Sequence, residues 1–92
     1  MTAVLTVEAK PVAGGWECAV QVGGGASASR HTVSVRAGDL ERLGRPGEKP
    51  EQLVTRAFEF LLAREPAGSI LRDFELDDIS RYFPDFERKI RV

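Results

Sequence analysis

Two neighbouring stretches of the chain alternate apolar and polar residues, and this alternation limits what the chain can fold into. Every second residue of segment 16–22 belongs to one face, which carries Trp16, Cys18, Val20 and Val22. In segment 30–36 the corresponding face carries His31, Val33 and Val35. Successive side chains of a β-strand point to opposite sides, so both segments are predicted to be strands with one buried face. Gly23, Gly24 and Gly25 between them predict a flexible turn.

A further strand is predicted at the N-terminus. Residues 3–9 form a short run rich in β-branched side chains, and we expect it to end at Lys10 and Pro11 because proline removes a backbone donor. Gly14 and Gly15 then supply a turn. Residues 1–36 are therefore predicted to form a three-stranded antiparallel β-meander, which needs a cover for its apolar face.

A long amphipathic helix over residues 50–64 is the predicted cover. Pro50 suits the first helical position, and Glu51 complements the positive end of the helix dipole. Its apolar stripe consists of Leu53, Val54, Ala57, Phe58, Leu61 and Leu62. Phe60 stands off this stripe, so we expect either the C-terminal segment or a partner to cover it.

Residues 37–49 connect the sheet to this helix. Leu40 to Leu43 are predicted to form one or two helical turns, closed by Gly44 in a position that tolerates positive φ. Residues 45–49, which include Pro46 and Gly47, are predicted to be a loop.

The C-terminal segment 69–92 is predicted to form two or three short helices. Ser69 could cap a turn that begins at Ile70, Asp77 could cap a second, and Pro84 marks the start of a third. Aromatic residues are concentrated here, and they either complete the core or form a docking surface. The candidate partner-binding residues are Phe60, Tyr82, Phe83 and Phe86.

These elements predict a single α+β domain of 92 residues. The net charge is 13 − 14 = −1, and no segment has a basic excess that would favour nucleic acid or an anionic membrane. Cys18 is the only cysteine, which excludes an intrachain disulfide. The sequence contains neither a signal peptide nor a membrane span, so we expect a cytoplasmic location.

No pattern of residues predicts a metal or cofactor. Asp73, Glu75 and Asp77 alternate like the first ligands of an EF-hand, but Asp78 replaces the required glycine and Pro84 the required glutamate. The glycines at 23–25 are not followed by the lysine and helix of a phosphate-binding loop. We therefore expect neither cofactor nor metal.

Two alternatives to a protein-binding role rest on particular residues. Cys18 and His31 could pair across adjacent strands as thiolate and base in a small thiol-dependent enzyme, although no oxyanion hole is indicated and we expect no catalytic residue. Helix 50–64 followed by segment 77–83 has the order of a helix-turn-helix, but Pro84 and the absence of a basic surface disfavour nucleic acid.

The run FEFLLAREPAGSILRDFELDDISRYFPDFERKI, residues 58–90, resembles a family of small, functionally uncharacterised bacterial proteins. Their shared pattern is FEFLL-RE followed by SILR-F-L--I-RYFP-(F/Y)E--I. The resemblance covers about a third of the chain and implies a bacterial setting. It implies no activity and assigns no functional residue.

The leading hypothesis from the sequence is a non-enzymatic bacterial protein that acts as a protein-binding, accessory or regulatory module. Its expected partner is another protein or a second copy of itself, since an open strand edge tends to find a partner. A nucleic-acid-binding regulator is the first alternative, and a thiol-dependent enzyme is the second.

Overall fold

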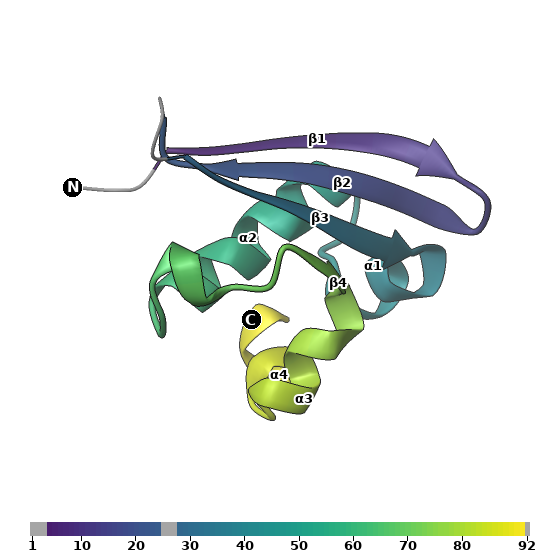
Figure 1. Cartoon of the computed structure of the whole chain (residues 1–92). Coiled ribbons are helices and arrows are strands. Elements are labelled where there is room, and N and C mark those ends of the chain that lie inside the picture. The colour runs from purple at the N-terminus through teal and green to yellow at the C-terminus, as the bar shows by residue number, and fades with distance from the viewer. Residues whose placement is uncertain (1–3, 25–27, 92) are drawn as a thin grey trace.

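A computed structural model describes residues 4–24 and 28–91 of the chain. Figure 1 shows a sheet as one layer, with the helices gathered on one of its faces. The α+β class is therefore confirmed, while Gly25 of the predicted glycine turn lies outside the described residues. None of the described helices is both long enough and apolar enough to cross a membrane.

Three strands form the predicted antiparallel ladder. β1 (Leu5–Val12), β2 (Gly15–Val22) and β3 (Ser29–Arg36) lie side by side in that order. Cys18 pairs with Val33, and Val20 pairs with His31. All four of these side chains are buried, so the alternation did identify the core face.

β1 is longer than predicted, because Pro11 does not end it. Gly23 N–H donates to the carbonyl of Val4 at 2.8 Å, and Val12 pairs with Gly15 across the two-residue turn. Since antiparallel ladders bond at alternate residues, the even-numbered residues of β1 direct their backbone groups toward β2. Pro11 therefore faces away from β2, where it needs no donor.

A fourth strand corrects the predicted meander. β4 (Asp73–Glu75) pairs in parallel with β3, which makes the sheet mixed, in the order β1-β2-β3-β4. Thr32 N–H donates to the carbonyl of Arg72 at 2.6 Å. Three residues are too few to show an alternation, and their partner strand is remote in sequence, so local pattern does not predict β4.

The helix α1 (Ala37–Leu43) begins earlier than predicted. The Asp39 carboxylate accepts a hydrogen bond from Arg36 N–H at 3.0 Å, which satisfies a donor at the helix start. Gly44 follows this helix with φ −78°, so the predicted positive φ is wrong. Glycine is needed here for space instead, because a Cβ would lie 2.5 Å from the Leu40 carbonyl oxygen.

The helix α2 (Pro50–Leu62) begins at the predicted residue and ends two residues early. Its predicted stripe covers the sheet, with Leu53, Val54, Ala57 and Phe58 fully buried. The Phe58 ring lies 5.3 Å from the ring of His31 and 6.0 Å from that of Phe74, measured between centroids. Phe58 thus joins α2 to both central and edge strands.

Phe60 occupies the opposite side of α2, where the C-terminal segment covers it. Its ring packs edge-on against Phe83 at 5.8 Å and Phe86 at 5.1 Å, and the Arg64 guanidinium lies 3.6 Å from its centroid. Phe60 is only 9 % exposed. α2 is therefore a central layer between the sheet and the C-terminal helices.

The C-terminal segment is more broken than predicted. It consists of the 3-10 turns η2 (Ala67–Ser69) and η3 (Leu76–Asp78) and the short helices α3 (Ile79–Tyr82) and α4 (Phe86–Ile90). Neither predicted cap forms: Ser69 ends η2, and Asp77 pairs with Arg42 at 2.9 Å. Asp78 acts as a cap instead, accepting from Glu75 N–H at 3.1 Å.

Arg56 of α2 forms hydrogen bonds to two other segments, the loop before α2 and the end of α4. Its guanidinium donates to both carboxylate oxygens of Glu48, at 2.7 and 2.6 Å, and to the carbonyl of Ile90 at the end of α4. The Arg56 and Glu48 side chains are only 17 % and 7 % exposed. The hydrogen bonds from Arg56 lower the pKa of Glu48, so the pair stays charged in mildly acidic solution.

We expect Arg56→Met to lower the free energy of unfolding by about 3 kcal/mol, because it removes the guanidinium that holds both oxygens of the nearly buried Glu48 carboxylate. Chemical denaturation at pH 7 would measure the change. Arg36→Met is the matched control, since Arg36 pairs with Glu75 at 2.9 Å but the two side chains are 73 % and 49 % exposed. That control should change stability by less than about 1 kcal/mol, and equal losses in the two variants would refute the structural role of Arg56.

Candidate functional site

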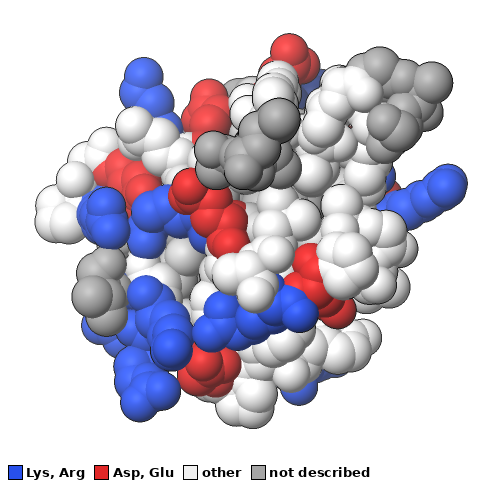
Figure 2. All heavy atoms as spheres, turned by 90° about the vertical axis from the view of Figure 1, so that its left-hand side faces the viewer, with Lys and Arg blue, Asp and Glu red and all other residues white. Residues whose placement is uncertain are grey.

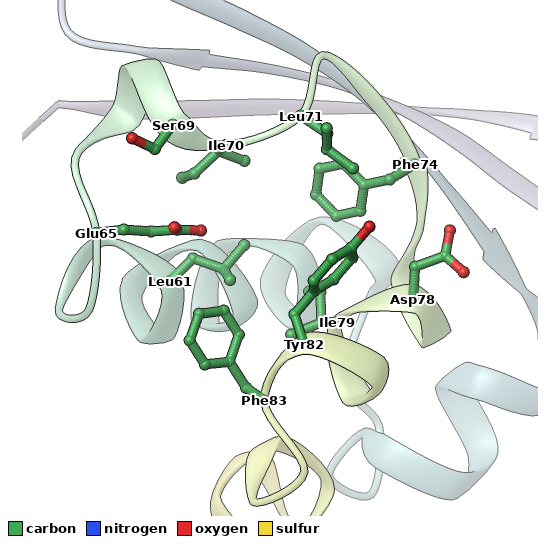
Figure 3. Close-up of a pocket in the computed structure, with 10 residues that line it drawn as sticks. All are labelled: Leu61, Glu65, Ser69, Ile70, Leu71, Phe74, Asp78, Ile79, Tyr82 and Phe83. Atoms are coloured by element: carbon green, nitrogen blue, oxygen red, sulfur yellow. The ribbon is translucent and has the colours of Figure 1, made fainter.

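A groove lies between the C-terminal end of α2 and the segment that follows it. Its volume is about 360 Å³, within the range of about 300 to 1,000 Å³ typical of ligand pockets. The lining residues, drawn in Figure 3, are Leu61, Glu65, Ser69, Ile70, Leu71, Phe74, Asp78, Ile79, Tyr82 and Phe83. Most of these are apolar or aromatic, and we call this surface the apolar groove.

The groove exists because the chain leaves α2 and comes back to it. After η2 the chain runs to the sheet, where β4 pairs with β3 and places Phe74 on the groove wall. It then turns through η3 and α3, and Tyr82 and Phe83 form the facing wall. The two walls are held at different places, since one is bonded to the sheet and the other is packed on Phe60.

Two large apolar side chains at the groove are left in solvent. Tyr82 is 68 % exposed and Leu71 is 52 % exposed. Ile70 and Ile79, also in the lining, are 7 % and 3 % exposed and belong to the core. Exposed aromatic and aliphatic side chains above a buried apolar floor are typical of docking surfaces.

Glu65 gives the groove an uncompensated negative charge. Its carboxylate is directed toward the groove in Figure 3, and the residue is half-buried. Within residues 4–24 and 28–91, its side chain has no ion pair or hydrogen bond. Asp78, across the groove, is already engaged as the cap of η3 and lies 3.9 Å from the Arg81 guanidinium. A cationic group in the groove would therefore find Glu65 available.

The structure divides the four candidate partner-binding residues of the sequence analysis. Phe60 and Phe86 are 9 % and 0 % exposed, so they are core residues that a partner does not reach in this conformation. Their edge-to-face packing removes both rings from water, which is the physical reason for the correction. Phe83 is half-buried against Phe60, and Tyr82 is exposed; both line the groove.

Leu71 and Glu65 are groove residues that the sequence analysis missed. The local sequence does not mark either residue as part of a site. The groove forms only when β4 pairs with β3 and the residues before β4 are thereby held beside the sheet. The Leu71 carbonyl itself accepts a hydrogen bond from His31 Nδ1 at 2.7 Å, a contact between residues 40 apart.

Cys18 and His31 do not form the thiolate and base pair that the alternative of a thiol-dependent enzyme requires. Cys18 is fully buried opposite Val33, and burial, assisted by the charge of Glu51, raises the pKa of its thiol to about 11. His31 is held by Ser29 Oγ at 2.6 Å and by the Leu71 carbonyl. Cys18 is thus a protonated core thiol at neutral pH, and His31 joins β3 to the segment before β4.

The acidic residues of the C-terminal segment bind arginines. Arg42 contacts Asp77 and Glu87 at 2.9 Å each, and the Glu87 hydrogen bond is the main cause that raises the pKa of Arg42. Glu75 is bound to Arg36. No cluster of three or more potential ligands capable of holding a metal is found where the structure is described, that is outside 1–3, 25–27 and 92.

The helix pair considered for DNA recognition is not separated from the core. α3 has only four residues, and Ile79 at its start is buried. Several basic side chains of the described residues lie within 4.0 Å of a carboxylate, among them Arg36, Arg42, Arg56, Arg64, Arg81 and Lys89. Figure 2 shows basic and acidic side chains next to one another over the face turned to the viewer.

Comparison with known proteins identifies no relative for this arrangement. No family model matches the chain, no curated protein matches its sequence, and no solved structure matches its fold. The resemblance of residues 58–90 to a bacterial family therefore stays a prediction.

We expect alkaline pH to destabilise the protein partly through Cys18. The unfolded thiol has a pKa near 9 and the folded one a pKa of about 11, so the stabilisation is complete below pH 9 and is lost as pH rises to 11. The loss should reach about 2 to 3 kcal/mol, at about 1.4 kcal/mol for each unit of pKa difference. Denaturation curves at pH 8 to 11 for the wild type and for Cys18→Ala would measure it.

The variant supplies the reference, since the two proteins differ only at residue 18. The wild type should lose more unfolding free energy over this range than Cys18→Ala does. Parallel pH profiles, or rapid alkylation of the folded protein at pH 7, would contradict the assignment of Cys18 as a protonated core residue.

Proposed function

We propose that this protein is a non-enzymatic protein-binding module, with an accessory or regulatory role in the bacterial cytoplasm, and that its apolar groove holds a segment of the partner. The observation that carries this proposal is the pairing of exposed Tyr82 and Leu71 over a groove of about 360 Å³. Their exposure favours binding because water leaves both side chains when a partner covers them.

The available energy suits a weak or regulated interaction. Fully covering a large apolar side chain contributes about 1.5 to 3 kcal/mol, and Tyr82 and Leu71 are each already partly covered. Tyrosine is also enriched among the few residues that dominate binding energy, since its ring is rigid and its hydroxyl can keep a hydrogen bond. Two such side chains supply at most about 3 to 6 kcal/mol, so the groove alone supports binding from about the millimolar range to tens of micromolar.

The charge of the groove indicates the chemistry of the segment. Glu65 has no cation among the described residues, and a lysine or arginine of a partner would supply one. An apolar anchor for the floor and a basic residue for Glu65 together define the expected ligand. The net charge of −1, with no segment of basic excess, favours a protein over a nucleic acid as partner.

Selection from a displayed library of random twelve-residue peptides should enrich sequences that combine an aromatic or large aliphatic residue with a lysine or arginine. A synthetic peptide of the enriched type should bind the wild type, measured by calorimetry, and bind Tyr82→Ala at least tenfold more weakly. Glu65→Gln should weaken it about five- to tenfold, and high salt should remove that difference.

Val4→Ala is the matched control, because Val4 is 64 % exposed but lies outside the groove. It should bind the peptide as the wild type does. A library without enrichment, or peptides that bind Tyr82→Ala and the wild type equally, would exclude the groove as a peptide site. Circular dichroism of each variant would separate lost binding from lost folding.

A further inference from the structure

Within the part of the chain that the structure describes, β1 forms a long open edge of the sheet, remote from the apolar groove. The strand order places β1 at one edge and β4, which contributes Phe74 to the groove, at the other. β4 is three residues long, and its Glu75 N–H is already bonded to Asp78. β1 is eight residues long, so it offers most of the unpaired backbone of the sheet.

The backbone groups available on this edge belong to the odd-numbered residues. The even-numbered residues of β1 bond to β2, as the Gly23 to Val4 hydrogen bond shows. Leu5, Val7 and Ala9 therefore present both N–H and C=O outward, whereas Pro11 presents only C=O. The side chains of these three residues lie on the helix side of the sheet. They are only half-buried against the core, so the apolar face of the sheet is still partly exposed at this edge.

The other face of β1 carries two opposite charges that form no ion pair within the part of the chain described. Glu8 and Lys10 are exposed, and neither has an ion pair or hydrogen bond from its side chain there. Glu17 stands opposite Lys10 on β2 but is farther than the 4.0 Å of an ion pair. A strand with Lys opposite Glu8 and Glu opposite Lys10 would satisfy both.

A second copy of β1 is such a strand. In an antiparallel pair centred on Ala9, Glu8 of each copy lies opposite Lys10 of the other. A pair centred on Glu8 would place the two Glu8 carboxylates opposite one another, and a pair centred on Val7 would place Glu8 opposite Thr6. Only the first register uses both charges, because like charges directly opposite each other are destabilising.

We propose that the protein forms a symmetric homodimer through antiparallel β1 strands centred on Ala9. The two Ala9 residues exchange both backbone hydrogen bonds, and Val7 N–H of each copy donates to the Pro11 carbonyl of the other. Pro11 has no N–H to offer in return, and its position leaves every other bond of this register possible. The two sheets become one continuous sheet, and Val7 gains an apolar neighbour in Pro11 of the second copy.

Charge reversal tests both the dimer and its register. Sedimentation velocity of the wild type over a concentration series should show a monomer and dimer equilibrium. Glu8→Lys and Lys10→Glu, each alone, should raise the dissociation constant at least tenfold, because like charges then face one another. An equimolar mixture of the two variants should restore the dimer, since two lysines of one chain then face two glutamates of the other.

Arg30→Glu is the control, because it reverses an exposed charge on the same face of the sheet but on β3, two strands away from the proposed pairs. It should dimerise as the wild type does, and so should Tyr82→Ala, which separates this surface from the groove. The proposal is overturned by a wild type that stays monomeric at about 100 µM, by single variants that dimerise normally, or by a mixture no more dimeric than its components.

Discussion

The structure depends on one helix that is apolar on two opposite sides. α2 places Phe58 against the sheet, in contact with His31 and Phe74, and places Phe60 against Phe83 and Phe86. Both rings are almost fully removed from water. A helix in this position must be covered twice, so the C-terminal segment packs back onto α2 rather than extending away from it.

The groove follows from this second covering. Residues 70–74 are drawn to the sheet by the parallel pairing of β4, whereas Phe83 and Phe86 are drawn to Phe60. The two attachments diverge, and no side chain of the described residues fills the space between them completely. Two arginines also hold the C-terminal segment in place. Arg56 donates to the Ile90 carbonyl at the end of α4, and Arg42 binds the carboxylates of Asp77 and Glu87. The candidate site thus lies where the residues bonded to the sheet separate from the residues packed on Phe60.

Local patterns were reliable where burial repeats along the chain. The alternation of 16–22 and 30–36 identified strands and their buried faces, and the stripe of 50–62 identified the helix and its sheet-facing side. The position of Phe60 off that stripe correctly indicated a second packing surface. The same reasoning missed β4 and misjudged Pro11, Gly44, Ser69 and Asp77, since each of these depends on a partner distant in sequence or on the direction of one backbone group. Of the candidate site, only Tyr82 and Phe83 could be named beforehand.

The sequence by itself determined the α+β class, the three main strands, the long helix and the concentration of aromatic residues near the C-terminus. It did so because apolar residues repeat along the chain with the period of a strand or of a helix. The tertiary structure alone decided which aromatic residues are core and which are surface. Tyr82 and Phe86 are both aromatic and only four residues apart, yet one is 68 % exposed and the other 0 %. The difference arises because Phe60 has room for Phe83 and Phe86, while Tyr82 points to the groove that the returning chain leaves open.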